Sequence, residues 1–124
     1  METTSQTVGI IGEELAFQFL VRKGYKVLLR NYSCPLGEID LIAKESGALV
    51  FIEVKTRRSD AMGLPSESVT FRKRGQIART AEYYMKRYGI KDCPCRFDVV
   101  SILLGESGDD PQIDLIRHAF LKGE

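Results

Sequence analysis

Residues 37–55 read GEIDLIAKESGALVFIEVK, and this stretch decides how the chain folds. Two strand-like and mainly apolar runs flank the dipeptide Ser46-Gly47, which is typical of turns. The stretch therefore predicts a β-hairpin. If the hairpin pivots symmetrically on this dipeptide, Asp40 lies directly opposite Glu53, and Glu38 lies opposite Lys55.

The two faces of this hairpin are expected to differ sharply, because successive side chains of a strand point to opposite faces. One face would carry all the charged residues at these positions, and the other would be wholly apolar. The charged face is predicted to hold Glu38, Asp40, Ile42, Phe51, Glu53 and Lys55. The apolar face is predicted to hold Ile39, Leu41, Ala43, Val50, Ile52 and Val54.

The opposed acids Asp40 and Glu53 need a physical reason, because like charges facing each other on a sheet cost roughly 0.2–1 kcal/mol even when they are exposed. A divalent cation would turn this repulsion into attraction. Mg²⁺ is commonly held by one or two carboxylates, water and phosphate oxygens. Two acids with Lys55 beside them therefore suit metal-assisted chemistry on a phosphate ester. A surface salt-bridge cluster on an exposed sheet face is the structural alternative.

The composition fits one globular domain, since 124 residues with 44% hydrophobic and 28% charged content can bury a core of ordinary size. We expect residues 1–6 to form a flexible tail and residues 7–124 to form a single domain. No apolar run approaches the length of a membrane helix, and residues 1–6 do not resemble a signal peptide. Three cysteines without a repeated CxxC spacing indicate reduced thiols in a cytoplasmic protein.

Charge is unevenly distributed although the net charge is only +1. From Lys55 to Lys91 there are ten lysines and arginines against three acids, whereas residues 92–124 hold three against seven. A basic surface that begins at Lys55 is what an enzyme acting on a phosphodiester would need. An ordinary solvated helix face explains the same charges equally well.

The remaining elements follow from periodicity and turn signals. Helices are predicted over about residues 7–23 and 70–88, the second capped by Thr70, and strands over 25–32, 96–104 and 113–121. Loops are predicted over 31–37, 56–68 and 105–111. In the first helix, Glu13 flanks the apolar stripe, whereas Glu14 points nearly opposite to it. The order αβββαββ predicts a mixed α/β or α+β fold around one sheet.

These residues resemble a known group of proteins. Asp40, a spacer and Glu53-Val54-Lys55 are similar to the motif of the PD-(D/E)XK nuclease superfamily, which includes type II restriction enzymes and archaeal Holliday-junction resolvases. Five further strings resemble the small bacterial UPF0102 family, also called YraN-like: GE at 12–13, RNY at 30–32, GEIDLIA at 37–43, FIEVKTR at 51–57 and RFDVV at 96–100. The resemblance spans about residues 7–120. One departure is Ile39, which stands where the superfamily motif has proline.

The resemblance implies a restriction-endonuclease-like αβββαβ core with one extra C-terminal strand, and a role for each site residue. Asp40 and Glu53 would hold Mg²⁺ or Mn²⁺ together with the backbone carbonyl of Val54. Lys55 would orient or deprotonate the attacking water, and Glu13 would act as an indirect ligand or through water. Residues expected to contact nucleic acid are Arg57, Arg58, Lys73, Arg74 and Arg79.

The sequence therefore predicts a metal-dependent endodeoxyribonuclease, with branched or damaged DNA as a candidate substrate. The alternative is a nucleic-acid-binding or partner-binding module that keeps the fold without turnover, and an RNase is a third reading. DNA is the expected partner, and a homodimer is compatible with action on a symmetric junction. No membrane and no nucleotide cofactor are expected.

Overall fold

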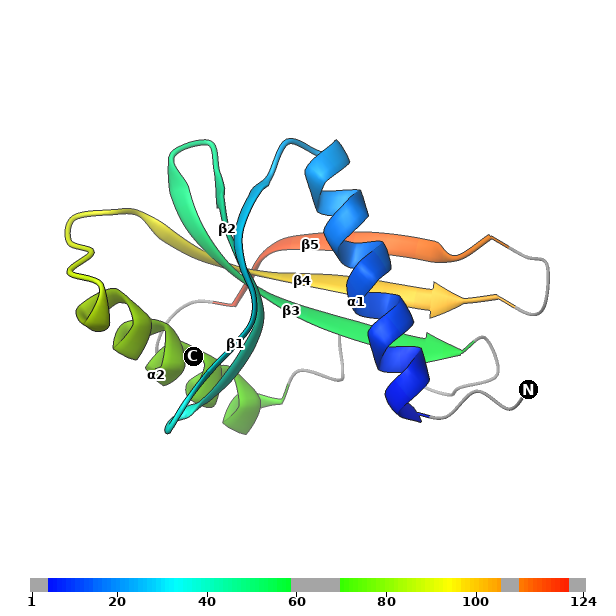
Figure 1. Ribbon diagram of the computed structural model, residues 1–124, viewed down its shortest axis with the longest axis horizontal. Coiled ribbons are helices and arrows are strands. Elements are labelled where there is room, and N and C mark those ends of the chain that lie inside the picture. Colours follow the sequence, from blue (N-terminus) through cyan, green and yellow to red (C-terminus); the bar gives the residue numbers. More distant parts are fainter. Residues whose placement is uncertain (1–4, 59–69, 106–109, 121–124) are drawn as a thin grey trace.

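The computed structural model describes residues 5–58, 70–105 and 110–120, and within these ranges it holds two helices and five strands (Figure 1). In chain order they are α1 (Ser5–Arg22), β1 (Lys26–Cys34), β2 (Gly37–Glu45), β3 (Ala48–Arg58), α2 (Phe71–Arg87), β4 (Cys95–Leu104) and β5 (Gln112–Phe120). The predicted αβββαββ order is therefore confirmed. The fold is mixed α/β, with the αβββαβ core and one extra C-terminal strand.

The five strands form one sheet in the order β1-β2-β3-β4-β5. Strands β3 and β4 are parallel, and the other neighbouring pairs are antiparallel. Helix α2 lies in the connection between β3 and β4, because parallel neighbours need a long crossover. The central strand β3, which carries Glu53 and Lys55, is thus held by β2 on one side and by β4 on the other.

The β2–β3 hairpin has the register that the sequence predicts. Leu41 pairs with Ile52, and Glu45 pairs with Ala48 beside the turn. The same register would place Asp40 opposite Glu53, but the paired residues of this hairpin end at Leu41. The two acids therefore lie at the point where β2 begins to separate from β3.

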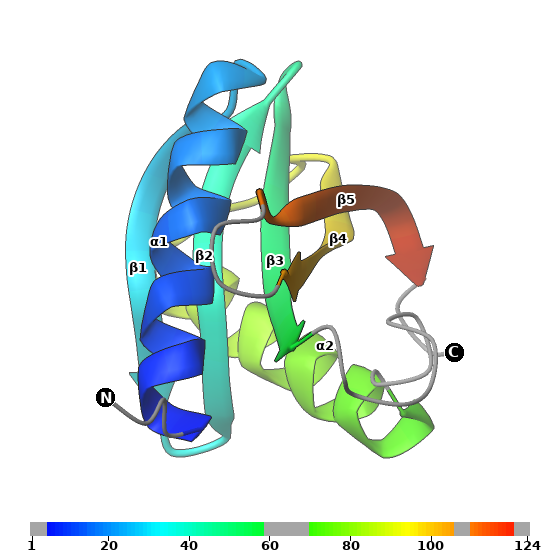
Figure 2. The same cartoon turned by 90° about the vertical axis from the view of Figure 1, so that its right-hand side faces the viewer.

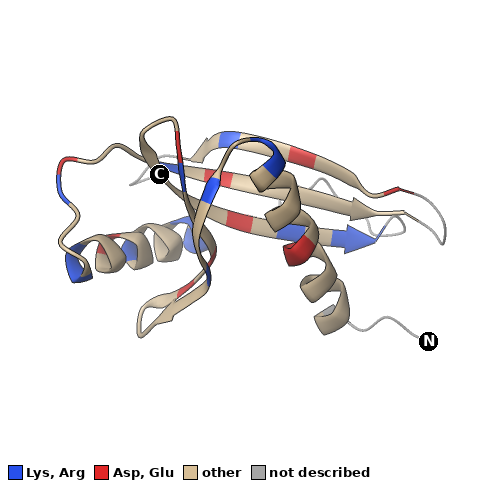
Figure 3. Cartoon of the chain, turned by 45° about the horizontal axis from the view of Figure 1, so that its top comes forward, with Lys and Arg blue, Asp and Glu red and all other residues tan. Residues whose placement is uncertain are grey.

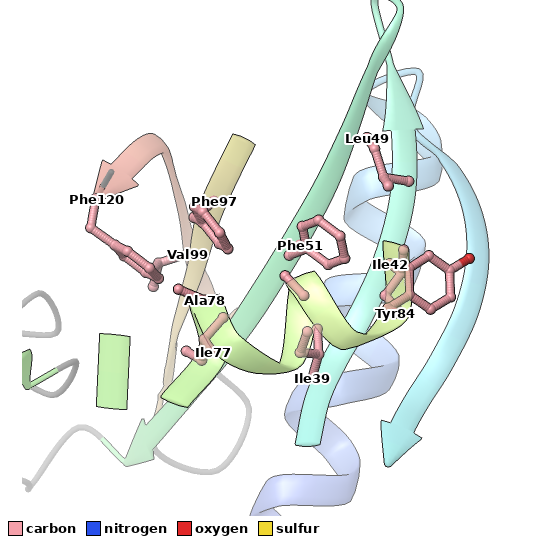
Figure 4. Close-up of a cluster of buried hydrophobic side chains, with 11 residues drawn as sticks. Ile39, Ile42, Leu49, Phe51, Ile77, Ala78, Tyr84, Phe97, Val99 and Phe120 are labelled. Carbon is pink, nitrogen blue, oxygen red and sulfur yellow. The ribbon is translucent and has the colours of Figure 1, made fainter. Parts of the chain in front are cut away.

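The sheet has a hydrophobic core on each face, with α1 and α2 on opposite sides (Figure 2). On the α2 side, Phe51 and Phe97 pack with Ile77 and Tyr84 of the helix (Figure 4). On the α1 side, Ala16 and Leu20 of the helix contact a second set of strand residues: Leu41, Ala43, Val50, Ile52, Val100 and Ile102. Alternation along β3 and β4 explains this division, since neighbouring residues face opposite helices.

One residue of the hairpin departs from the predicted alternation. Ile39 is buried in the α2-side cluster with Ile42 and Phe51, not on the opposite face with Leu41 (Figure 4). The prediction for Ile39 is therefore wrong. Ile39 lies beyond the last paired residue of the hairpin, where β2 is free to twist away from β3 and turn this side chain toward α2.

Two strands are longer than their sequences suggest. β1 continues through residues 33–34, beyond the predicted strand end at residue 32, because it stays paired with β2 from Lys26 to Cys34. β3 continues through residues 56–58, because it stays paired with β4 as far as Arg58. The rest of the predicted 56–68 loop lies mostly outside the described residues, as do residues 1–4 of the expected tail; α1 begins at Ser5.

Helix α2 begins as predicted. Thr70 is its N-cap and accepts a hydrogen bond from the backbone N–H of Lys73 at 3.2 Å. Among the described residues, neither helix combines the length and apolar character that crossing a membrane would require. Cys34, Cys93 and Cys95 are free thiols.

Candidate active site

Asp40 is fixed at the separation point of β2 and β3 by the backbone of the neighbouring strand. The N–H of Val54 donates to Asp40 Oδ2 at 2.7 Å. This amide would otherwise face a gap in the β2–β3 ladder, so the carboxylate replaces a strand partner. In a strand, the N–H and C=O of one residue point to the same edge. The carbonyl of Val54 is therefore directed to the side of β3 on which Asp40 lies.

Glu53 is buried on the face of β3 that α2 covers, with only 7% of its side chain exposed. Two ammonium groups approach the same carboxylate oxygen: Lys55 Nζ lies 3.7 Å from Glu53 Oε1, and Lys73 Nζ lies 3.5 Å from it. Lys55 follows Glu53 by two residues on the same strand face, whereas Lys73 reaches across from α2. The site thus combines Asp40 and Glu53 with two cations.

Burial disfavours the ionised form of both acids. It raises the pKa of Glu53 to about 7, and repulsion from Asp40 adds to this effect, while Lys73 and Lys55 oppose it. Burial also raises the pKa of Asp40, against the hydrogen bond from Val54 and the two lysines. Perturbed carboxyls that share a site are a frequent mark of function, and a cation between them would favour the ionised forms.

Glu13 joins this site from α1. It is half-buried, and its pKa is raised by burial first and by the charge of Asp40 second. Glu14 instead faces solvent and pairs with Arg30 at 2.7 Å. Gly12 brings the helix close to the sheet, because a Cβ at this position would lie 1.7 Å from Oγ1 of Thr56. The sequence expectation for Glu13 and Glu14 matches these positions.

Two grooves lie near Asp40 and Lys73, and the larger runs between the β1–β2 turn and α2. The larger has a volume of about 320 Å³ and is lined by Ser33, Cys34, Pro35, Leu36, Gly37, Glu38, Lys73 and Gln76. The smaller has a volume of about 170 Å³ and is lined by Asn31, Ser33, Glu38, Ile39 and Asp40. Ser33 and Glu38 line both grooves, whereas Lys73 lines only the larger and Asp40 only the smaller. Glu38 is exposed and contributes to raising the pKa of Asp40.

The five residues expected to contact nucleic acid come from two elements, β3 and α2. Arg57 and Arg58 continue β3 beyond Lys55 and give the end of this strand its positive charge (Figure 3). Lys73 reaches the acids directly. Arg74 lies over the ring of Phe120 at 5.9 Å, and Arg79 is exposed on α2 with its guanidinium close to Gly75.

The approach of Lys73 to Glu53 is the feature that sequence reasoning missed. The sequence placed this lysine in a phosphate-binding group without connecting it to the acids. One local signal was available, because a cation in the first turn of a helix opposes the helix dipole. This signal could not identify Glu53 as the partner that compensates the charge of Lys73, because that contact depends on how α2 packs against β3.

A second polar cluster, which the sequence did not predict, is buried near the start of β4. Arg96 donates to Asp98 at 2.9 Å and to Glu45 at 2.8 Å. Tyr25 donates to Asp98 at 2.8 Å, and its pKa is raised to about 12 mainly by burial. The backbone N–H of His118 also donates to Asp98, at 3.1 Å. Because each charge has a partner, this cluster is a structural anchor between β4 and its neighbours.

The residues at Asp40 suit a hard divalent cation. Among the described residues, no group of three or more His, Cys, Asp or Glu side chains could hold a metal. Asp40, Glu53 and the backbone carbonyl of Val54 would offer oxygen ligands alone, and Mg²⁺ often takes only one or two carboxylates and keeps several waters. The mutual repulsion of Asp40 and Glu53, and the raised pKa of each, is what such a cation would relieve.

Known proteins similar to this chain agree on its family. Residues 12–102 match the model described as "Uncharacterised protein family UPF0102". A UPF0102 protein of Caldicellulosiruptor saccharolyticus is 47% identical over 113 residues, covering 91% of this chain and 96% of its own. One of Moorella thermoacetica is 44% identical over 120 residues, covering 97% of this chain and 100% of its own. 

Among solved structures, the chain is similar to one described as "Structure of EndoMS-dsDNA2 complex". The TM-score is 0.39 and the identity 22%, over 78% of this chain and 38% of that one. A similarity this distant carries no conclusion about the site. The family model and the relatives together are decisive: the chain belongs to the UPF0102 family.

Proposed function

We propose that this chain is a divalent-metal-dependent endodeoxyribonuclease of the PD-(D/E)XK type, which hydrolyses phosphodiester bonds in DNA and leaves a 5′-phosphate and a 3′-hydroxyl. The observation that carries the proposal is half-buried Asp40 beside buried Glu53, with Lys55 Nζ 3.7 Å from Glu53 Oε1. Lys55 and Lys73 only partly offset the burial and the mutual repulsion of the two acids, so a functional demand is the simplest explanation of the pair.

Each residue has a distinct role in this proposal. Asp40, Glu53 and the carbonyl of Val54 would hold Mg²⁺ or Mn²⁺. The bound ion would supply Lewis-acid stabilisation of the phosphate and a more acidic water. Lys55 orients the attacking water and offers positive charge to the transition state. Glu13 acts at the edge of the site, through a water or as an outer ligand.

The surroundings of the acids favour a nucleic acid as the substrate. Arg57 and Arg58 extend the charge of Lys55 along the end of β3, where phosphates of a bound strand would be attracted. The larger groove, beside α2, is lined by Lys73, and the smaller is lined by Asp40. We expect a DNA strand to lie against these grooves, and branched or nicked DNA to be cut in preference to plain duplex.

The test is cleavage of labelled four-way-junction, flap, nicked, duplex and single-stranded DNA with Mg²⁺ or Mn²⁺. Wild type is compared with Glu53→Gln, Lys55→Met and Lys86→Met. Lys86 is an exposed lysine near the far end of α2, so its variant matches the charge change of Lys55→Met. We expect metal-dependent cutting that falls by about 10²–10⁴ in the two site variants and stays at wild-type level in Lys86→Met.

Cutting that persists in Glu53→Gln and Lys55→Met would contradict the proposal. So would the absence of cutting on every substrate with either metal. If binding then remained and weakened steeply with salt, the chain would be a nucleic-acid-binding module that keeps the fold. Ribose substrates run in parallel separate a DNase from an RNase.

A further inference from the structure

Lys73 contacts the acid pair although it lies outside the hairpin that carries the nuclease motif. Its Nζ is 3.5 Å from Glu53 Oε1, slightly closer than the 3.7 Å of Lys55 Nζ to the same oxygen. Two cations on one carboxylate oxygen are more than the neutralisation of Glu53 alone requires. Charge balance at Glu53 therefore does not explain the presence of both lysines.

The position of Lys73 is fixed by the start of α2. Its backbone N–H donates to Oγ1 of Thr70 at 3.2 Å, which holds it in the first helical turn. A positive charge at this place opposes the helix dipole and is unfavourable there. The backbone is thus anchored at an unfavourable place for a cation, while the flexible side chain spans the distance to Glu53.

Lys73 also differs from Lys55 in what lies beside it. The Lys73 side chain is 38% exposed, against 26% for Lys55. Lys73 lines the larger groove together with Gln76 and Glu38. The ammonium group therefore stands where the groove meets the acids, with solvent-facing room on the groove side.

The charges decide what happens to this contact when the acids bind a cation. Lys73 and Lys55 partly neutralise Asp40 and Glu53 in the metal-free protein. Ligation of a divalent ion by the same carboxylates would repel both ammonium groups. Lys73 has the open groove beside it, so it is the lysine that can turn away from Glu53 and toward a substrate.

We infer that Lys73 is a second catalytic lysine, which leaves Glu53 when the site is loaded and contacts a non-bridging oxygen of the scissile phosphate. The inference rests on the proposed nuclease function. In the hydrolysis, the water oxygen bonds to phosphorus and loses one proton to solvent, the P–O3′ bond breaks, and the 3′ oxygen takes up a proton from solvent. Lys73 remains protonated throughout and contributes positive charge where the transition state gains negative charge.

The experiment compares Lys73→Met with Lys86→Met, an equal charge change about 20 Å further along the same helix. The first measurement is Mn²⁺ affinity without DNA, followed by electron paramagnetic resonance of the free ion. Removal of a competing ammonium group should tighten Mn²⁺ binding several-fold in Lys73→Met, with no change in Lys86→Met. This readout does not depend on cleavage.

The second measurement is single-turnover cleavage at saturating DNA. We expect the rate to fall by about 10²–10³ in Lys73→Met, with DNA affinity changed by less than about threefold, the size of a weak surface contact. Lys73→Arg should restore most of the rate because it keeps the charge. Circular dichroism of each variant confirms that the fold is retained.

Three results would overturn the inference. Weaker Mn²⁺ binding in Lys73→Met would mean that the lysine supports the site structurally. A loss confined to DNA affinity would make it an ordinary phosphate contact. Wild-type cleavage by Lys73→Met would remove it from the reaction while leaving the proposed function intact. If wild type itself cuts nothing, the proposed function fails, and the catalytic role of Lys73 fails with it.

Discussion

Gly12 of α1 packs directly against Thr56 of β3, so closely that a Cβ on Gly12 would lie 1.7 Å from Thr56 Oγ1 and 2.7 Å from its Cβ. This contact sets how near the helix comes to the strand that carries Glu53 and Lys55. Because Glu13 is the next residue, the same contact brings its carboxylate within the influence of Asp40. The glycine thus couples the packing of α1 to the composition of the site.

Gly12→Ala is expected to push α1 away from β3 and to destabilise the protein by about 1–3 kcal/mol, as overpacking does. Urea unfolding measures the change. Gly9→Ala is the matched control, because a Cβ at Gly9 meets nothing within 4 Å on the same helix. It should stabilise the protein by up to about 1 kcal/mol, since alanine favours a helix over glycine. Equal effects of the two substitutions would contradict the role of close packing at Gly12.

The raised pKa of Glu53 makes the metal-free protein less stable as pH rises. The folded state holds a proton on Glu53 up to about pH 7, whereas the unfolded chain releases it near 4.5. Between these values the native state binds more protons, so the free energy of unfolding falls with increasing pH, by an amount on the order of a few kcal/mol. Below about pH 4.5 this penalty is absent.

Glu53→Gln should therefore flatten the decline in stability between pH 4.5 and 7 that Glu53 causes. The measurement is urea unfolding in chelator-treated buffer across this range. Asp40 adds to the same slope, because its pKa is raised as well. Glu14→Gln is the control, since Glu14 is exposed and its pKa is lowered by hydrogen bonds from Arg30 and Gln18. An unchanged slope in Glu53→Gln would show that Glu53 titrates normally.

Asp40→Asn should retain the fold and lose metal binding. The amide oxygen of asparagine can still accept the hydrogen bond that Val54 donates at 2.7 Å, but it lacks the charge that attracts the ion. We expect Mn²⁺ affinity at pH 7.5 to fall by about tenfold or more, on the scale of losing a group that supports a metal site. Asp110→Asn, at an exposed residue, should bind Mn²⁺ as wild type does. Equal Mn²⁺ affinities of wild type, Asp40→Asn and Asp110→Asn would mean that the ion binds elsewhere.

Arg96→Met should be strongly destabilising, because it strands Asp98, whose side chain is fully buried, without its cationic partner. Breaking a buried ion pair from one side costs about 3–5 kcal/mol. Arg117 and Arg96 both pair with Glu45, but the Arg117 side chain is 47% exposed. Arg117→Met should therefore cost less than about 1 kcal/mol. Thermal unfolding at pH 7 compares the two. A small effect of Arg96→Met would mean that the cluster is dispensable.

The hairpin could be predicted well because its information is local. The turn at Ser46-Gly47 and the apolar runs around it gave the register that pairs Leu41 with Ile52. Strand periodicity then put Glu53 on the face of Phe51 and Lys55. What failed was the alternation at Ile39, where β2 is no longer tied to β3 and twist turns the side chain to the other face.

Strand ends could not be predicted from local signals, since Arg58 and Cys34 stay in strands only because β4 and β2 are there to pair with them. One part of the cluster around Asp98 was visible in the sequence, because an arginine and an acid stand inside an apolar strand. Its partner Tyr25 is far away in the chain, and nothing in either segment identifies the other.

The sequence by itself determined the element order, the place of Asp40 and Glu53 on the two strands of one hairpin, and the lysine that follows Glu53, because each depends on the period of a strand or the geometry of one turn. Only the tertiary structure decided that Lys73 lies beside Glu53 and that Gly12 brings Glu13 to Asp40. Both depend on how a helix docks on the sheet. That docking is set by the two hydrophobic cores as a whole, which no local pattern encodes.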